Sequence, residues 1–199
     1  MTEARAVDAQ FRDDPCRGGD VFVDPAPGGG LVAEAPGQAL VVGVGEGDDT
    51  VRLARRGWLV TAVDTSHARL QRAVARSTGI ASGSVAWVRA DVSLTPPPAR
   101  AFDLVCVRQL LLPRGSGERA WGRLLAAVAP GGALLVFGRD PVQASVEGGQ
   151  GEAGFCQVND VAELLGDRWS MVVHETLQQA ARAGMPSVHE SVLRARRLS

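Results

Sequence analysis

From Ala39 onward, short apolar runs rich in valine and leucine alternate with amphipathic segments of helical period. Strands that are buried on both faces read as continuous apolar runs, and helices between them favour parallel pairing, so this alternation predicts a parallel α/β sheet. The runs that we assign to strands are ALVVGV (39–44), WLVTAVD (58–64), SVAWVRA (84–90), FDLVCV (102–107) and GALLVFG (132–138). The chain of 199 residues is long enough to bury the core of one such domain.

The segments between these runs predict the helices at 49–56, 66–77 and 117–129. Ser66 is placed to cap the second helix, because its hydroxyl can accept a hydrogen bond from a free N–H of the first turn. The third helix is expected to end at Pro130, Gly131 and Gly132. Three consecutive prolines in the segment 93–100 bar a regular helix, so a crossover loop is expected there.

The two ends of the chain differ in pattern from this central region. Residues 1–37 are rich in Asp, Gly and Pro and are expected to form an arm or lid, whereas residues 38–199 are expected to form a single domain. A Gly-rich insert follows Asp140, and a short helix capped by Asn159 is predicted at about 159–166. Two further alternating runs predict an antiparallel hairpin at the edge of the sheet, at 169–175 and 187–197.

A glycine-rich loop, VVGVGEGDD (41–49), follows the first predicted strand. Its glycines would let the backbone turn sharply and approach a ligand closely, as in nucleotide-binding βαβ units; they are Gly43, Gly45 and Gly47. Asp64 ends the next strand, where an acid can accept hydrogen bonds from the hydroxyls of a ribose. The loop and the acid together predict a nucleotide or nucleoside site.

The charges of this loop bear on which nucleotide it could hold. The dinucleotide fingerprint has Gly or Ala where this chain has Asp48, and Glu46 and Asp49 add two more carboxylates around the same helix N-terminus. A carboxylate beside a phosphate is unfavourable, so a ligand with positive charge and no phosphate suits the loop better. S-adenosylmethionine (SAM), with its sulfonium and ammonium groups, is such a ligand.

Several segments in order make the chain resemble the class I SAM-dependent methyltransferases, and most of all their small tellurite-resistance/thiopurine-type branch in bacteria. These segments are VVGVGEG, LARRGWLVTAVDTS (53–66), VRADV (88–92), FDLVCVRQLLLP (102–113) and VAPGGALLVFGRDP (128–141), and the final VLRARR also resembles the last strand of such proteins. The likeness covers about four-fifths of the chain. It implies a Rossmann-like fold, with a mostly parallel seven-stranded sheet and an antiparallel C-terminal edge strand, and SAM as the cofactor.

The resemblance also implies which residues hold the cofactor. The loop beneath its methionine and ribose would be Gly43, Val44, Gly45, Glu46 and Gly47. Asp64 would bind the ribose hydroxyls, and Thr65 would lie beside the adenine. Asp91 and the backbone of Val92 would hold the adenine amino group.

The resemblance further implies that Arg108 and Gln109, at the end of the fourth strand, face the methyl group and the substrate. Arg139 and Asp140 follow the fifth strand and could orient the substrate at the pocket edge, because ligands bind outside the carboxyl ends of parallel strands. The chain departs from the family pattern at Val41, where many relatives have an acid, and in the loop RQLLLP, where relatives often carry a histidine.

Composition excludes several other classes of protein. All 21 basic residues are Arg and there is no Tyr. Mechanisms that need a lysine Schiff base, a P-loop lysine or a tyrosine acid are therefore excluded. A net charge of −1 argues against broad capture of nucleic acid or an anionic membrane. The sequence shows no secretory signal and no apolar run long enough to span a bilayer. Three scattered cysteines predict neither a disulfide framework nor a zinc site, so a cytoplasmic protein without a metal is expected.

The leading hypothesis is methyl transfer from SAM to a small-molecule acceptor. The alternative is a catalytically degenerate protein that binds SAM or S-adenosylhomocysteine (SAH) as a sensor or partner. A nicotinamide oxidoreductase is disfavoured by the acidic loop and by the absence of Tyr and Lys. No catalytic base is assigned, because Asp140 and His67 are only weak candidates, and the sequence does not set the oligomeric state.

Some residues have structural interpretations beside the functional ones. Asp64 could cap a strand or helix, Asp91 could cap its own loop, and Asp103 is expected to satisfy backbone donors at the start of a strand. Cys106 is expected to be a buried small hydrophobe. The four tryptophans are assigned to packing: Trp58, Trp87, Trp121 and Trp169.

Overall fold

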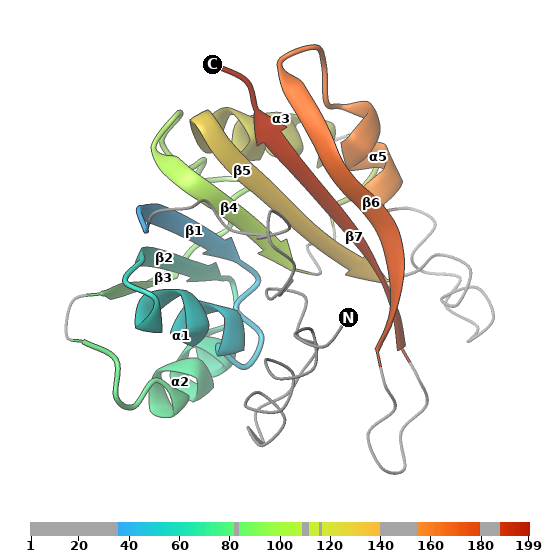
Figure 1. The fold of residues 1–199 in the computed structure, drawn as a ribbon. Coiled ribbons are helices and arrows are strands. Elements are labelled where there is room, and N and C mark those ends of the chain that lie inside the picture. Colours follow the sequence, from blue (N-terminus) through green and yellow to red (C-terminus); the bar gives the residue numbers. More distant parts are fainter. Residues whose placement is uncertain (1–35, 82–83, 109–111, 116, 140–154, 180–187) are drawn as a thin grey trace, which may run out of the picture.

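The structure is a computed structural model that describes residues 36–81, 84–108, 112–115, 117–139, 155–179 and 188–199. Its centre is a seven-stranded sheet in the order β3-β2-β1-β4-β5-β7-β6 (Figure 1). The strands are β1 (Gln38–Val42), β2 (Leu59–Asp64), β3 (Val85–Arg89), β4 (Phe102–Arg108), β5 (Val128–Arg139), β6 (Trp169–Gln179) and β7 (Val188–Arg197). All five strands predicted from the central apolar runs are present, with ends that differ by a few residues.

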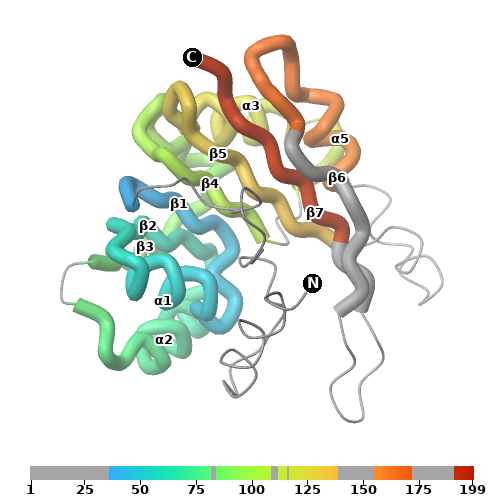
Figure 2. The backbone as a smooth tube through the Cα atoms, in the orientation of Figure 1, coloured from blue at the N-terminus to red at the C-terminus, as the bar shows by residue number. Residues whose placement is uncertain are grey.

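The sheet is parallel from β3 through β5 and reverses only at β7. β7 pairs antiparallel with β5 on one side and with β6 on the other. Figure 2 traces β7 beside β5, and β6 is the outermost strand. The predicted fold class and edge hairpin are therefore confirmed, but the C-terminal strand itself lies one position inside the edge.

Helices cover both faces of the sheet, and alternate residues of the strands face opposite layers. On one face, Leu40 and Val42 pack in a cluster with α3 (Gly117–Ala127) and α5 (Val158–Glu163). On the other face, Ala39 and Val41 pack with α1 (Asp48–Arg55), and α2 (His67–Arg76) lies on that same side (Figure 1). This period of two is what a strand buried on both faces requires.

The cap predicted for α2 is confirmed, because the backbone N–H of Arg69 donates to Ser66 Oγ at 3.3 Å. The cap predicted for α5 is wrong. This helix starts one residue earlier, with Gln157 as the N-cap, and Asp160 Oδ2 accepts from the Gln157 N–H at 2.7 Å. Asn159 lies within the helix and is exposed, since an acid three residues after the cap offers the better reciprocal bond.

The end of α3 also differs from the expectation. The helix ends at Ala127, and β5 begins at once with Val128, so the segment Pro130–Gly132 lies in a bulge of the strand. The guanidinium of Arg197 donates to the carbonyls of Ala126 and Val128, at 3.1 and 2.6 Å. A cation at a helix C-terminus satisfies carbonyls that have no partner within the helix. Arg197 of β7 therefore stabilises the C-terminal end of α3.

The segment 93–100 forms turns and no helix, as its prolines predict. Within the described ranges, every helix is too short or too polar to cross a lipid bilayer. Cys106 is fully buried in β4, and Asp103 Oδ2 accepts from the Gln38 N–H at 2.8 Å, so both structural interpretations are confirmed. The predicted arm (1–37) and the Gly-rich insert after Asp140 lie almost wholly outside the described residues.

Candidate functional site

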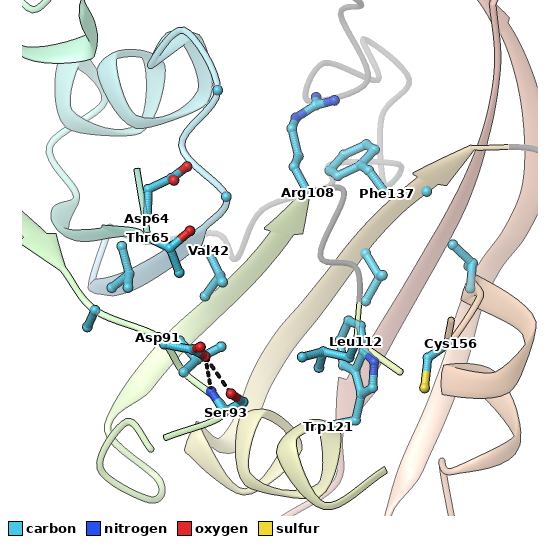
Figure 3. A pocket seen from close by; sticks show the side chains of 18 of the residues that line it. Val42, Asp64, Thr65, Asp91, Ser93, Arg108, Leu112, Trp121, Phe137 and Cys156 are labelled. Carbon is cyan, nitrogen blue, oxygen red and sulfur yellow. Dashed lines mark hydrogen bonds between the residues drawn. The ribbon is translucent and has the colours of Figure 1, made fainter. Parts of the chain in front are cut away.

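A pocket of about 840 Å³ lies at the carboxyl ends of the parallel strands (Figure 3). This volume falls within the roughly 300–1,000 Å³ typical of small-molecule sites. Residues from the ends of β1, β2, β4 and β5 and from the loop after β3 line it. Seven of the predicted site residues are among them: Gly43, Gly45, Asp64, Thr65, Asp91, Val92 and Arg108.

The three loop glycines have different roles, although all have positive φ. A Cβ on Gly43 would lie 2.2 Å from the carbonyl oxygen of Arg108, so only glycine lets the loop cross the end of β4. A Cβ on Gly47 would lie 2.8 Å from Ala73 Cβ, so Gly47 lets α1 approach α2. Gly45 meets nothing within 4 Å and lines the pocket, which makes it the glycine at which a ligand can approach the backbone.

The rest of the loop does not line the pocket as the resemblance implied. Val44 is buried against α2, Gly47 packs on the same helix, and Glu46 is exposed. The carboxylate of Glu46 lies 3.4 Å from the guanidinium of Arg72. Period and spacing identified the loop correctly, but they could not tell which of its residues face the ligand.

Each acid of this loop has an arginine partner, so the loop is less negative than its own residues indicate. Glu46 and Asp48 both pair with Arg76, and Asp49 pairs with Arg108. The partners come from α2 and β4, which lie far along the chain, so local sequence does not reveal them. Since the carboxylates are compensated, the loop charge by itself neither excludes a phosphate nor selects a cation.

Asp64 is only 5% exposed and ends β2 at the pocket wall. One carboxylate oxygen accepts from the N–H of Val44 at 3.1 Å, and the other accepts from the N–H of Ser66 at 2.8 Å. These bonds hold the glycine loop and the start of α2 to one side chain, as the structural interpretation expects. Each oxygen keeps a second lone pair, so the same carboxylate can also accept from ligand hydroxyls.

Asp91 lies just after β3, which ends at Arg89, and it lines the pocket. Its Oδ1 accepts from the hydroxyl and from the backbone N–H of Ser93, at 2.6 and 2.8 Å (Figure 3). The Ser93 hydroxyl bond and then the Ser93 N–H bond lower the pKa of Asp91, because both stabilise the charged form. Asp91 thus caps its own loop, as its structural interpretation expects. Its charged carboxylate also faces the pocket.

Replacing Ser93 by alanine is expected to raise the pKa of Asp91 towards its ordinary value, because the strongest of the stabilising bonds is lost. In the wild type the folded-state pKa is the lower one, so these bonds add stability above the unfolded-state pKa, and that stability is lost as the pH falls through the folded-state pKa. Carbon-detected NMR titration of the Asp91 carboxyl measures the shift. Ser84→Ala is the control, since the Ser84 hydroxyl bonds to the carbonyl of Ala81. An equal Asp91 pKa in all three proteins would contradict this account.

Arg108 joins three elements at the mouth of the pocket. Its guanidinium pairs with Asp49 at the start of α1 and lies 4.0 Å from the ring centroid of Phe137, at the end of β5 (Figure 3). Asp49 is only 7% exposed, so the pair is shielded from water on that side. The arginine therefore reaches the pocket as predicted, with its charge balanced by an acid from the glycine-loop helix.

The other predicted substrate residues lie at the limit of what the structure describes. Arg139 ends β5, beside the pocket-lining residues of that strand, and its side chain is not described. Gln109 and Asp140 lie outside the described residues. His67 is exposed on α2 and does not line the pocket, as expected of a solvated first-turn histidine.

Several lining residues were missed in the sequence. They are Val42, Val63, Arg69, Ala90, Ser93, Leu112, Pro113, Trp121, Val136, Phe137, Gly138, Cys156, Gln157 and Val158. The rule that ligands bind at strand carboxyl ends could have found Val136 and Phe137. Trp121 lies in the core as predicted, but it also lines the pocket.

Cys156 is a poor nucleophile in this wall. Burial, followed by the negative charge of Asp160, raises the pKa of its thiol, so the thiol is neutral at neutral pH. Its sulfur lies 3.9 Å from the carbonyl of Pro113. The arrangement therefore gives this cysteine a packing role.

Comparison with known proteins agrees with this geometry. Residues 39–132 match a family model described as a methyltransferase domain. An uncharacterized methyltransferase of Mycobacterium tuberculosis is 38% identical over 97 residues, which are 49% of this chain and 48% of that protein. The trans-aconitate 2-methyltransferase of Paracidovorax citrulli is 37% identical over 105 residues, 51% of this chain and 38% of that protein. The chain thus spans about half the length, or less, of the curated relatives that it matches.

Solved structures share the fold at low sequence identity. The N-methyltransferase NodS from Bradyrhizobium japonicum WM9 superposes with a TM-score of 0.65 and 21% identity, covering 83% of this chain and 88% of that one. The same enzyme in complex with SAH gives a TM-score of 0.66 and 19% identity, covering 83% and 80%. Residues 39–132 thus match the methyltransferase-domain family, and the chain has the Rossmann-like fold of class I methyltransferases.

Proposed function

We propose that the protein is a SAM-dependent methyltransferase that acts on a small-molecule acceptor. The observation that carries this proposal is the pocket at the strand ends, where the open backbone of Gly45 and the carboxylates of Asp64 and Asp91 share one wall. A buried acid at the end of β2 suits ribose hydroxyls, and a second acid beyond β3 suits an amino group. The family match over residues 39–132 supports the same assignment.

In this proposal each residue has a defined task. Asp64 accepts from the ribose hydroxyls, Asp91 and the backbone of Val92 hold the adenine amino group, and Thr65 lies beside the adenine ring. The backbone at Gly43 and Gly45 passes beneath the methionine portion. The tellurite-resistance/thiopurine-type branch, a bacterial cytoplasmic setting, and one domain over 38–199 with an arm before it stay predictions.

When bound, SAM supplies an electrophilic methyl group on sulfur, which a nucleophile takes by in-line attack. The chain itself aligns the two reactants and excludes water, and proximity alone accounts for much of such a rate enhancement. A soft, already ionised nucleophile needs no base. For an oxygen or nitrogen acceptor a base would take the proton, and no residue of this chain is assigned to that task.

The alternative of a degenerate SAM- or SAH-binding protein rests on two departures from the family pattern, at Val41 and in the loop RQLLLP. Val41 is buried in the cluster under α1 and does not line the pocket, so it supplies no polar group to a cofactor there. The loop from Gln109 to Leu111 lies outside the described residues.

Calorimetric titration with SAM, SAH, NADH and NADPH tests the cofactor. We expect SAM and SAH to bind, and NADH and NADPH not to bind. Absence of a heat of binding with both SAM and SAH would refute the proposal. Formation of SAH across a panel of thiols, phenols, amines and oxyanions then separates enzyme from sensor. A protein that binds SAM yet forms no SAH with any acceptor would support the alternative.

A further inference from the structure

The pocket has two halves of different chemistry. Neighbouring strands lie about 4.8 Å apart, so the strand ends from β3 to β5 span about 19 Å. The half beside β2 and β3 is polar and carries Asp64, Asp91 and Arg69. The half beside β4 and β5 is largely apolar, with walls formed by Leu112, Trp121, Val136, Cys156 and Val158 (Figure 3). Gln157 also lines this half, and its amide nitrogen donates to the carbonyl of Phe155 at 3.4 Å.

The apolar half offers little to a charged ligand. Among the described lining residues of this half, Arg108 is the one charged side chain, and it is paired with Asp49 and stacked on Phe137. The thiol of Cys156 is neutral, since burial raises its pKa. Moving a carboxylate or an oxyanion into such a place costs several kcal/mol of desolvation unless a partner compensates it.

One polar group in this half lacks a partner. The indole of Trp121 is only 2% exposed, and its Nε1 has no hydrogen-bond partner in the described structure. Figure 3 shows the ring between Leu112 and Cys156, with the nitrogen on the side of Cys156. An indole N–H can only donate, and most buried donors in proteins are satisfied by protein, water or ligand. An acceptor atom of a ligand in this half of the pocket would satisfy the donor.

Resting on the proposed function, we infer that the apolar half is the methyl-acceptor site and takes a neutral, aromatic-sized molecule whose oxygen or nitrogen accepts a hydrogen bond from Trp121 Nε1. The apolar walls bind the body of the molecule, and the N–H fixes its orientation. A tricarboxylate or an inorganic oxyanion is excluded from this half, because the charge of Arg108 is already balanced by Asp49 and would not compensate the water that the anion loses.

A matched pair of probes tests the inference. Quinoline and naphthalene have the same shape, and only quinoline carries a ring nitrogen that accepts a hydrogen bond. In the presence of saturating SAH, the wild type is expected to bind quinoline about 5- to 10-fold more tightly than naphthalene, the effect of one hydrogen bond. trans-Aconitate, as an anionic comparison, is expected not to compete.

The variant Trp121→Phe keeps the ring and removes the N–H, so it is expected to abolish the preference for quinoline while leaving SAH affinity unchanged. Trp58→Phe is the matched control, since Trp58 is also 2% exposed but does not line the pocket. A preference that persists in Trp121→Phe, or competition by trans-aconitate, would overturn the inference.

The indole N–H resonance of Trp121 gives a readout that needs no folded variant. With SAH bound, quinoline is expected to shift this resonance downfield and naphthalene to leave it in place; equal shifts would count against the assignment. The two proposals fail separately. If SAH does not bind, the proposed function falls and takes the inference with it, whereas SAH binding without a quinoline preference removes the inference alone.

Discussion

Replacing Gly43 by alanine is expected to lower the free energy of unfolding by about 3 kcal/mol and to abolish cofactor binding. The φ of +79° costs a side chain about 1–2 kcal/mol, and a Cβ only 2.2 Å from the carbonyl oxygen of Arg108 forces the backbone apart at a further cost of about 1–3 kcal/mol. The displaced loop would no longer pass beneath the ligand. Urea unfolding and SAH calorimetry measure the two effects.

Gly79→Ala separates the two causes. Gly79 has nearly the same φ, +78°, but a Cβ there would meet nothing within 4 Å, and it lies away from the pocket. This control is expected to lose only about 1–2 kcal/mol and to bind SAH normally. If both variants lose the same stability, the close approach of the loop to β4 is not what requires glycine at position 43.

Replacing Asp64 by alanine is expected to weaken SAM binding by about 1–3 kcal/mol, or about 5- to 150-fold, because the ribose hydroxyls lose their charged acceptor. The same change strands the backbone N–H groups of Val44 and Ser66, so stability also falls, by about 2 kcal/mol. Calorimetry at a temperature where the variant is fully folded isolates the binding effect.

Asp103→Ala is the matched control for this experiment. Asp103 also accepts from a backbone N–H, that of Gln38, but it lies at the start of β4 and does not line the pocket. The control is expected to lose stability while its SAM affinity stays that of the wild type. Unchanged affinity in Asp64→Ala would place the ribose elsewhere.

The positions of the central strands were largely predictable, because each strand has its own apolar pattern in a short stretch of sequence. Each parallel strand is a continuous Val/Leu run, and residues such as Leu40 and Val41 face opposite layers, so the pattern alone gives strand positions. The reversal at the C-terminal hairpin was predicted from the two alternating runs. The internal place of β7 was not, because strand order depends on which edge accepts the last strand.

The site was predictable where it lies on strand ends and unpredictable where it depends on partners. Asp64 and Asp91 follow apolar runs at the right distance from the glycines. The arginines that neutralise the loop acids come from α2 and β4, and Trp121 reaches the pocket from a helix, so neither has a local signal. With these partners in place, the charge of the loop alone does not select the ligand.

The position of β7 between β5 and β6 has a consequence for biosynthesis. β6 leaves the ribosome before β7, yet in the finished sheet it pairs with β7 and not with β5. Until β7 emerges, the outer edge of β5 has no hydrogen-bonded neighbour. Such an unpaired edge can form hydrogen bonds with a strand of another chain. Arg197, which fastens the end of α3, arrives later still. The nascent protein therefore depends on its last strand to close both the sheet edge and the helix that carries one wall of the pocket.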